Sequence, residues 1–298
     1  MLPMSRNLSR REMLASGLAA AGALAVGGPL ATASSVLARP EGEYGPFKVG
    51  LQSYSLRHYK LAEALSKTKD LGLHYWESYS AHTNADPAKA SQYKTMASES
   101  GVKVAGFGVS PFTKNHDANR KYFEFGKAMG IDYLSADPDR DAFDSLDKLV
   151  EEYGIAIGIH PHGPGAKWVK IDQIADAIKD HSEKIGVCLD TGHFLRANED
   201  PVRAVEVFGK RIYGVHLKDV KDAKTFTILG KGDLKIGDLF QALAKVKYNY
   251  CMALEYEENM TNPIPDIEKC LMAIKDDVDT IKGFDRTPTK SNRRLEQR

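Results

Sequence analysis

The chain alternates between short apolar stretches rich in β-branched residues and longer stretches with helical periodicity, beginning near residue 47. The expected strands are 47–56, 73–80, 102–110, 131–138, 155–162, 185–193, 212–220 and 250–258. The expected helices are 60–71, 86–100, 116–129, 143–153, 170–182, 201–209, 235–246 and 264–282. Glycines follow several of these helices, at the position where a left-handed residue ends a helix: Gly72, Gly101, Gly130 and Gly154. This order predicts an α/β protein with a parallel sheet, and eight such units predict a (β/α)₈ (TIM) barrel.

An open, doubly wound sheet is the alternative architecture for the same order of elements. Such a fold usually carries a glycine-rich cofactor loop after its first strand. Here the first strand ends in "QSYSLR" (52–57), which contains no glycine. We therefore expect a single barrel domain over residues 47–283.

The first 38 residues differ in composition from the rest of the chain. Arg10 and Arg11 precede a run of Ala, Gly, Leu and Val, and small residues offer cleavage after Ala33 or Ala38. This pattern resembles a twin-arginine signal peptide, which predicts export of the folded protein to a periplasmic or other extracytoplasmic location. An uncleaved membrane anchor is the alternative, but the run is only weakly hydrophobic. We expect no membrane association once the signal is removed.

Two further segments flank the expected barrel. Residues 39–46 are predicted to be a linker. Residues 284–298 are polar and basic near their end, "RTPTKSNRRLEQR", and are predicted to be a disordered tail.

Charge and cysteine content exclude some classes of protein. The formal net charge is +1, so the sequence lacks the basic character of a nucleic-acid-binding surface. The three cysteines are Cys188, Cys251 and Cys270, and the first two lie in apolar strand patterns. We expect buried free thiols rather than a set of disulfides.

Polar residues recur where the expected strands end. These residues are Glu77, Asp137, His160, His162, Asp190, His193, His216, Lys218, Asp219, Glu255 and Glu257. In a barrel these strand ends share one mouth, so the side chains would converge. Mixed nitrogen and oxygen ligands suit a divalent Mn, Mg, Co or Zn ion, which would also relieve repulsion between buried carboxylates.

Each of these residues also has a structural interpretation. Asp190 can cap a following helix, and Lys218 can simply pair with Asp219. Glu257 and Glu258 are expected on a solvated loop, with Glu255 deeper because it directly follows "MAL". His74, His82 and His116 fall in helix or loop contexts and are expected at the surface.

The motifs, taken in order, resemble the xylose-isomerase-like barrel superfamily, often labelled sugar phosphate isomerase/epimerase, over roughly residues 47–282. They are "DTGH" (190–193), "HLKD" (216–219), "GKGDLKIGDLFQAL" (230–243), and "LEYEEN" (254–259) followed by "PIPDIEKCL" (263–271). The resemblance implies that Asp190, His216 and Glu255 bind a metal ion. It also implies a fourth ligand at the end of the fifth strand.

At that fifth strand the sequence departs from the family pattern. Many members carry Glu-Asn-His there, and this chain has "HPH", with His160 at the glutamate position and His162 at the histidine position. His160 is therefore the expected fourth ligand, with His162 as the other possibility. Because family isomerases and epimerases use glutamates of the fifth and eighth strands as a pair, the two-carboxylate mechanism is in doubt here.

The resulting hypothesis is a metal-dependent enzyme that acts on a sugar or keto-sugar through an enediolate-like intermediate. The reaction would be isomerisation, epimerisation or β-elimination, and the altered fifth strand and the signal favour elimination from a keto-glycoside. The candidate bases are Glu255, His160 and His162, with Lys218 as an acid or oxyanion contact. Candidate substrate contacts are Glu77, His193, Trp76 and Tyr54, although core packing also explains the last two.

Two other classes of function remain open at this point. A non-catalytic carbohydrate-binding barrel with a degenerate metal site would keep the cavity without turnover. An apurinic-site endonuclease shares the barrel, but it needs more metal ligands and a basic face for DNA. We therefore expect a small-molecule sugar or glycoside as the partner, and no nucleic acid.

Overall fold

The computed structural model describes residues 44–281, which contain a closed barrel of parallel strands. The barrel strands are β1 (Lys48–Gln52), β2 (Tyr75–Ser78), β3 (Lys103–Ser110), β4 (Tyr133–Ala136), β5 (Ala156–Ile159), β6 (Ile185–Asp190), β7 (Ile212–Leu217) and β10 (Cys251–Leu254). The order around the barrel is β1-β10-β7-β6-β5-β4-β3-β2. This confirms the predicted (β/α)₈ barrel.

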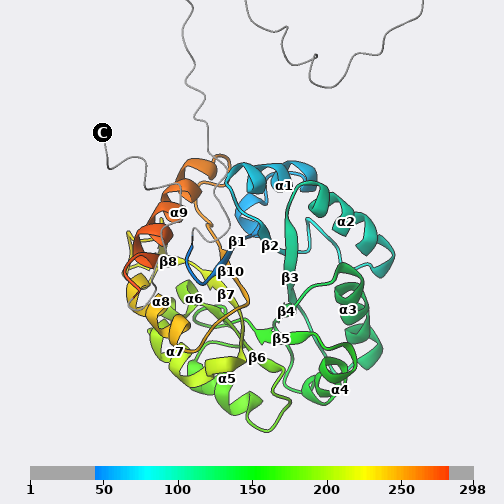
Figure 1. Cartoon of the computed structure of the whole chain (residues 1–298). Helices are drawn as coiled ribbons and strands as arrows, with labels where there is room; N and C mark the ends of the chain where they lie inside the picture. Colours follow the sequence, from blue (N-terminus) through cyan, green and yellow to red (C-terminus); the bar gives the residue numbers. More distant parts are fainter. Residues whose placement is uncertain (1–43, 282–298) are drawn as a thin grey trace, which may run out of the picture. The chain divides into compact units, whose positions relative to one another are not determined.

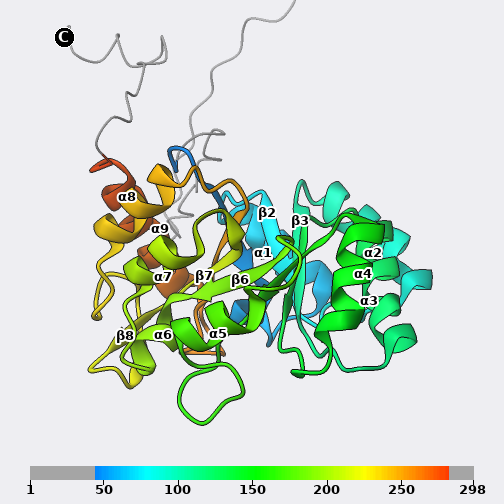
Figure 2. The same cartoon turned by 90° about the horizontal axis from the view of Figure 1, so that it is seen from below.

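Helices surround the strands as a ring (Figure 1). They are α1 (Leu61–Asp70), α2 (Pro87–Glu99), α3 (His116–Met129), α4 (Phe143–Tyr153), α5 (Ile171–Ile178), α6 (Thr191–Arg196), α7 (Pro201–Phe208), α8 (Ile236–Lys245) and α9 (Ile264–Val278). Figure 2 shows α2, α3 and α4 on one side of the barrel and α5 to α9 on the other. Among the described residues, no helix is long and apolar enough to cross a membrane.

Several predicted segments fall wholly or partly outside the described residues. These are the signal at 1–38, most of the linker at 39–46 and the tail at 284–298. Of the linker, residues 44–46 form a turn immediately before β1. All three cysteines are buried and free, as predicted. The four predicted helix-ending glycines adopt positive φ angles.

Most of the apolar core lies between the strands and the helices, and a smaller cluster fills the inside of the barrel. Tyr133 is a fully buried member of the inner cluster. It fits because glycines face it: a Cβ on Gly106 or Gly214 would lie 2.5 or 2.7 Å from its ring. These glycines let one aromatic ring occupy the barrel interior below the mouth.

All eight barrel strands are shorter than expected, and two of them are shorter for identifiable reasons. The strand expected at 185–193 ends at Asp190, because the Asp190 carboxylate accepts the backbone N–H of His193 and starts helix α6 there. The strand expected at 212–220 divides into β7 and β8 (Asp219–Lys221), and β8 forms an antiparallel pair with β9 (Thr225–Thr227).

Asp219 explains why the "HLKD" and "GKGD" motifs occur together. Its carboxylate accepts the backbone N–H groups of Val220, Gly230, Gly232 and Leu234 at 2.8–3.0 Å. A Cβ on Gly232 would lie 2.3 Å from this carboxylate, so the loop needs glycine there. Asp219 therefore holds the loop after β9 against β8, and the predicted pairing of Lys218 with Asp219 is wrong.

Replacing Asp219 with Ala should lower the free energy of unfolding by about 3 kcal/mol, because several charge-assisted hydrogen bonds are lost together. Asp219→Asn, which keeps one acceptor oxygen, should lose less. Urea denaturation followed by circular dichroism measures both values. A loss below about 1 kcal/mol in the Ala variant would show that the loop does not depend on this carboxylate.

Candidate metal centre and active site

A cavity of about 380 Å³ opens at the carboxyl ends of the barrel strands. Its lining residues are Gln52, Tyr54, Tyr79, Ser80, Gly108, Val109, His160, His162, His193, His216, Lys218, Glu255 and Glu257. They come from segments far apart in the sequence that the barrel brings to one mouth. Seven of the eleven predicted strand-end residues line the cavity, whereas Asp137 pairs with Lys167 and Asp219 binds the loop after β9, so the predicted convergence is present only in part.

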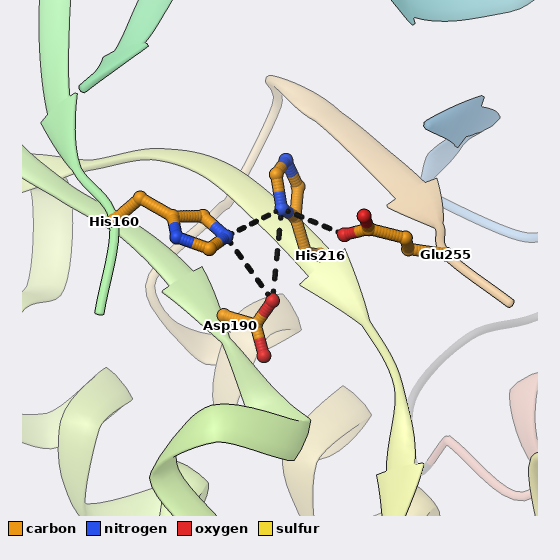
Figure 3. A group of neighbouring side chains, drawn as sticks. All are labelled: His160, Asp190, His216 and Glu255. Carbon is orange, nitrogen blue, oxygen red and sulfur yellow. Dashed lines mark hydrogen bonds and ion pairs between the residues drawn. The ribbon is translucent and has the colours of Figure 1, made fainter. Parts of the chain in front are cut away.

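Four side chains at the strand ends, three of which line this cavity, point their donor atoms at one another (Figure 3). They belong to His160, Asp190, His216 and Glu255, all are buried, and their donor atoms lie within 4.8 Å of one another. His160 follows β5, Asp190 ends β6, His216 lies on β7 and Glu255 follows β10. Register fixes part of this arrangement, because Asp190 pairs with His216 across the β6–β7 ladder.

The distances within this group are short. The Nδ1 atom of His216 lies 2.9 Å from His160 Nε2 and 3.1 Å from Glu255 Oε2. The Oδ2 atom of Asp190 lies 3.2 Å from His160 Nε2 and 3.7 Å from His216 Nδ1. One nitrogen from each ring and one oxygen from each carboxylate thus face a common centre.

Lys218 is the ammonium group of the cavity. Its Nζ lies 3.0 Å from Asp190 Oδ2, 3.0 Å from Glu255 Oε2 and 2.6 Å from Glu257 Oε1. Glu257 lies on the loop after β10, as predicted, but it is half-buried and lines the cavity, whereas Glu258 is exposed. The contact of Glu257 with Lys218 depends on the fold of the loop after β10, which no local sequence signal indicated.

The cluster holds more negative than positive charge when the histidines are neutral. Four carboxylates, those of Glu77, Asp190, Glu255 and Glu257, lie in contact with His216 or Lys218, and Lys218 is the only ammonium in this group. Asp190 Oδ2 and Glu255 Oε2 are buried, and neither accepts a hydrogen bond of good geometry. These unsatisfied oxygens and the imidazole nitrogens beside them fit a divalent cation.

Charge interactions dominate the pKa values of the acidic groups. Burial alone would raise the pKa of Glu255, but Lys218 and His216 lower it to about 2. Burial likewise opposes ionisation of Asp190, yet the Lys218 ammonium holds its pKa well below the ordinary value. Burial disfavours a charged His216, but Glu77 and Glu255 among its neighbours raise its pKa well above the usual value. The site thus favours positive charge at its centre.

The remaining imidazoles are kept neutral. Burial lowers the pKa of His160 to about 4 and that of His193 to about 3, and it also lowers the pKa of His162. The Nδ1 atom of His193 lies 3.2 Å from an Arg196 guanidinium nitrogen, which can only donate. His193 therefore carries its proton on Nε2 and acts as a hydrogen-bond donor.

Two predicted substrate contacts do not lie at the mouth. Glu77 is fully buried inside the barrel, where it accepts hydrogen bonds from Gln52, Tyr133 and Ser135. Because adjacent strand residues point to opposite faces, Trp76 faces the helices instead, and it is also fully buried. His82 stacks on Trp76 and is buried, so its predicted surface position is wrong.

The other predicted contacts lie where a ligand would touch them. Tyr54 and His193 both line the cavity. Sequence reasoning missed Tyr79 and Gln52, which line it as well. Tyr79 packs edge-on against Tyr54 at 5.4 Å, and its position two residues after Glu77 on the strand-end loop was the available signal.

A larger cavity of about 740 Å³ lies elsewhere, beside α2 and the start of β3. Its titratable lining residues include His74, Lys94 and Lys103, and Lys103 pairs with Asp132. Among the described residues, no Asp or Glu lines this cavity. The chemistry-bearing residues of the described chain gather instead in the smaller cavity at the mouth.

Fold and site together define a class: (β/α)₈ barrels with a candidate divalent-metal centre at the strand ends. A family described as xylose isomerase-like TIM barrel matches residues 65–275. The chain therefore belongs to the xylose isomerase-like TIM barrel family, as the sequence motifs indicated.

Individual relatives are distant. The chain is 26% identical over 215 residues to an inosose dehydratase of Mesomycoplasma hyopneumoniae (strain J), covering 56% of this chain and 71% of that protein. It is 28% identical over 145 residues to an inosose dehydratase of Bacillus thuringiensis (strain Al Hakam), covering 41% of this chain and about half, 48%, of that protein. A D-psicose 3-epimerase structure aligns with a TM-score of 0.60 at 16% identity, over 78% of this chain and 97% of that one, which shows the fold alone.

Without metal, the protein should lose stability steadily as pH falls from about 6.5 to 4. His160 and His193 have folded pKa values of about 4 and 3, below the ordinary value of 6.5. Below pH 6.5 the unfolded chain therefore binds protons that the folded chain does not, and each group contributes about 1.4 kcal/mol per pH unit. Urea denaturation in EDTA at several pH values measures this slope, which His193→Gln should reduce. A pH-independent stability would contradict this electrostatic description.

Proposed function

We propose that the protein is a divalent-metal-dependent enzyme that removes a proton beside the carbonyl of a keto-sugar and then eliminates a substituent. The main support is the cluster at the strand ends, in which His160, Asp190, His216 and Glu255 face one centre. The ion would be Mn, Mg, Co or Zn, and this donor set does not select among them. Once bound, the ion would supply Lewis acidity to the carbonyl oxygen of the substrate.

We assign the base to His162. Its ring lines the cavity, its lowered pKa keeps it neutral, and no side chain among residues 44–281 hydrogen-bonds to it. The other candidate bases are already engaged: Glu255 contacts Lys218 and His216, and His160 contacts Asp190. A free, neutral imidazole is the suitable proton acceptor near neutral pH.

The proposed reaction conserves atoms and charge with a single shuttled proton. His162 takes the proton from the carbon beside the carbonyl, leaving an enolate. The enolate electrons form the new C=C bond, and the bond from the β carbon to the leaving oxygen breaks with its electron pair. His162 then returns the proton to that oxygen. Lys218, whose pKa is raised well above normal by Asp190 and Glu255 despite burial, remains cationic and stabilises the developing negative charge.

Elimination is favoured over epimerisation for two reasons. Two-carboxylate epimerisation needs a second glutamate at the end of β5, where this chain has His160. The two relatives compared by sequence above are named as inosose dehydratases, and dehydration is an elimination. Isomerisation and epimerisation remain the alternatives on the same site.

The cavity favours an uncharged sugar over a sugar phosphate. Lys218 is the only Lys or Arg in its lining, and Asp190, Glu255 and Glu257 already surround that ammonium. A phosphate would meet carboxylates without a free cation to pair with. Tyr54 and Tyr79 offer aromatic surface on which a sugar ring can stack.

We also propose that the protein acts outside the cytoplasm, on the basis of the twin-arginine pattern in residues 1–38. An exported enzyme would meet glycosides rather than phosphorylated metabolites, which agrees with the charge of the cavity. Comparing the N-terminus of the protein from periplasmic and cytoplasmic fractions tests this proposal.

Turnover of a keto-sugar panel tests the reaction. With metal, the wild-type protein should release the β substituent from a keto-glycoside and form a conjugated enone, measured by ultraviolet absorbance and NMR. Asp190→Ala should lose both the bound metal and the activity. Deuterium exchange from solvent without elimination would point to epimerisation. Sugar binding without either reaction would favour a carbohydrate-binding barrel.

His162→Gln should reduce kcat by about 10²- to 10⁴-fold, the usual contribution of a general base, while metal content stays unchanged. The matched control is His74→Gln, because His74 is exposed and lies away from the mouth. Steady-state kinetics and metal analysis on the same samples measure both effects. An unchanged kcat in His162→Gln would reassign the base to Glu255 or His160.

A further inference from the structure

The two histidines that face the centre differ in what lies behind them. The outer nitrogen of His216, Nε2, lies 2.8 Å from the Glu77 carboxylate. The contact is bent, so it is an ion pair rather than a well-aligned hydrogen bond. The outer nitrogen of His160, Nδ1, is buried and has no hydrogen-bond partner among the described residues.

This difference matters because a neutral imidazole carries a single proton. A ring that binds a metal through one nitrogen must hold its proton on the other, where an acceptor normally receives it. His216 can bind through Nδ1 while its Nε2–H faces Glu77. If His160 bound through Nε2, its proton would lie on Nδ1, buried and without an acceptor.

The proton of His160 can instead lie on Nε2, where a carboxylate is within reach. Its Nε2 lies 3.2 Å from Asp190 Oδ2, a bent contact to an oxygen that accepts no well-aligned hydrogen bond, and 2.9 Å from His216 Nδ1. With the proton on Nε2, His160 can donate to that carboxylate and so orient it. The ring then supports a ligand instead of being one.

We propose, on the basis of the function inferred above, that Asp190, His216 and Glu255 hold the ion and that Glu77 is the positioning residue for His216. His160 lies outside the ligand set and orients Asp190. A carboxylate that never touches the ion therefore matters more for metal affinity than the histidine that faces it.

Burial and hydrogen bonds fix the position of the Glu77 side chain. Its side chain is fully buried, and it accepts hydrogen bonds from Tyr133 at 2.5 Å, Ser135 at 2.6 Å and Gln52 at 3.2 Å. The carboxylate is thus fixed where His216 Nε2 needs an acceptor.

Binding of Co²⁺ to the full chain tests the proposal without an assay of activity. Glu77→Gln keeps the shape and the Oε1 acceptor of the side chain and removes its charge. We expect this variant to bind Co²⁺ about 10- to 100-fold more weakly than wild type, with a changed visible spectrum of the bound ion. His160→Ala should weaken binding less than Glu77→Gln and leave the spectrum unchanged.

Asp137→Asn is the charge-matched control, because Asp137 follows β4 and pairs with Lys167 outside the cluster. Its Co²⁺ affinity should equal that of wild type. Thermal unfolding of each metal-free variant identifies any misfolded sample. For Glu77, Gln52→Ala serves as a second variant, which loosens the carboxylate without removing it and should give an intermediate affinity.

The outcomes separate this inference from the proposed function. If wild type binds Co²⁺ but His160→Ala loses it as strongly as Asp190→Ala, His160 is a ligand and this inference alone fails. Equal affinity in wild type and a folded Glu77→Gln would likewise overturn it. If wild type binds neither Co²⁺ nor Mn²⁺, the metal of the proposed function fails, and this inference fails with it.

Discussion

The structure depends on one electrostatic constraint: a group of carboxylates buried at the mouth of the barrel with a single ammonium among them. Removing carboxylates from water is costly unless charge or hydrogen bonds compensate. Lys218 compensates in part, because it contacts Asp190, Glu255 and Glu257 at once. The raised pKa of His216 shows the same demand for positive charge from the other side of the cluster. A divalent ion would balance the negative charge that Lys218 and His216 do not neutralise.

The barrel interior is shaped to support this cluster. Glycines on β3 and β7 leave room for the Tyr133 ring, and the Tyr133 hydroxyl donates to Glu77. Glu77 in turn contacts the outer nitrogen of His216. Residues below the mouth of the barrel thus orient the His216 side chain in the cavity. Side chains inside this barrel therefore do more than fill a packed core, because their hydrogen bonds also hold a residue of the cavity in place.

The sequence predicted the architecture and the position of the site well, because both follow from periodicity. Strand ends share one mouth in a parallel barrel, so Asp190, His216 and Glu255 could be placed together. Contacts that depend on loop conformation or on depth along a strand could not be predicted. Glu77 follows an apolar strand and suggested a mouth residue, but it lies fully buried. Glu257 reaches Lys218 only because of the fold of the loop after β10.

The replacement at the end of β5 gives the cavity two chemically different sides. One side carries neutral imidazoles, since burial keeps His160, His162 and His193 uncharged. The other carries Glu255, Glu257 and the cationic Lys218. Reversible inversion at carbon needs matched proton acceptors on both faces of the substrate. A site with a free base on one side and a fixed cation on the other is better suited to moving one proton while an anionic oxygen is stabilised. The elimination proposed above agrees with this asymmetry. It rests on the same physical argument as the proposed role of His160: each imidazole has one proton when neutral, and its surroundings decide where that proton lies.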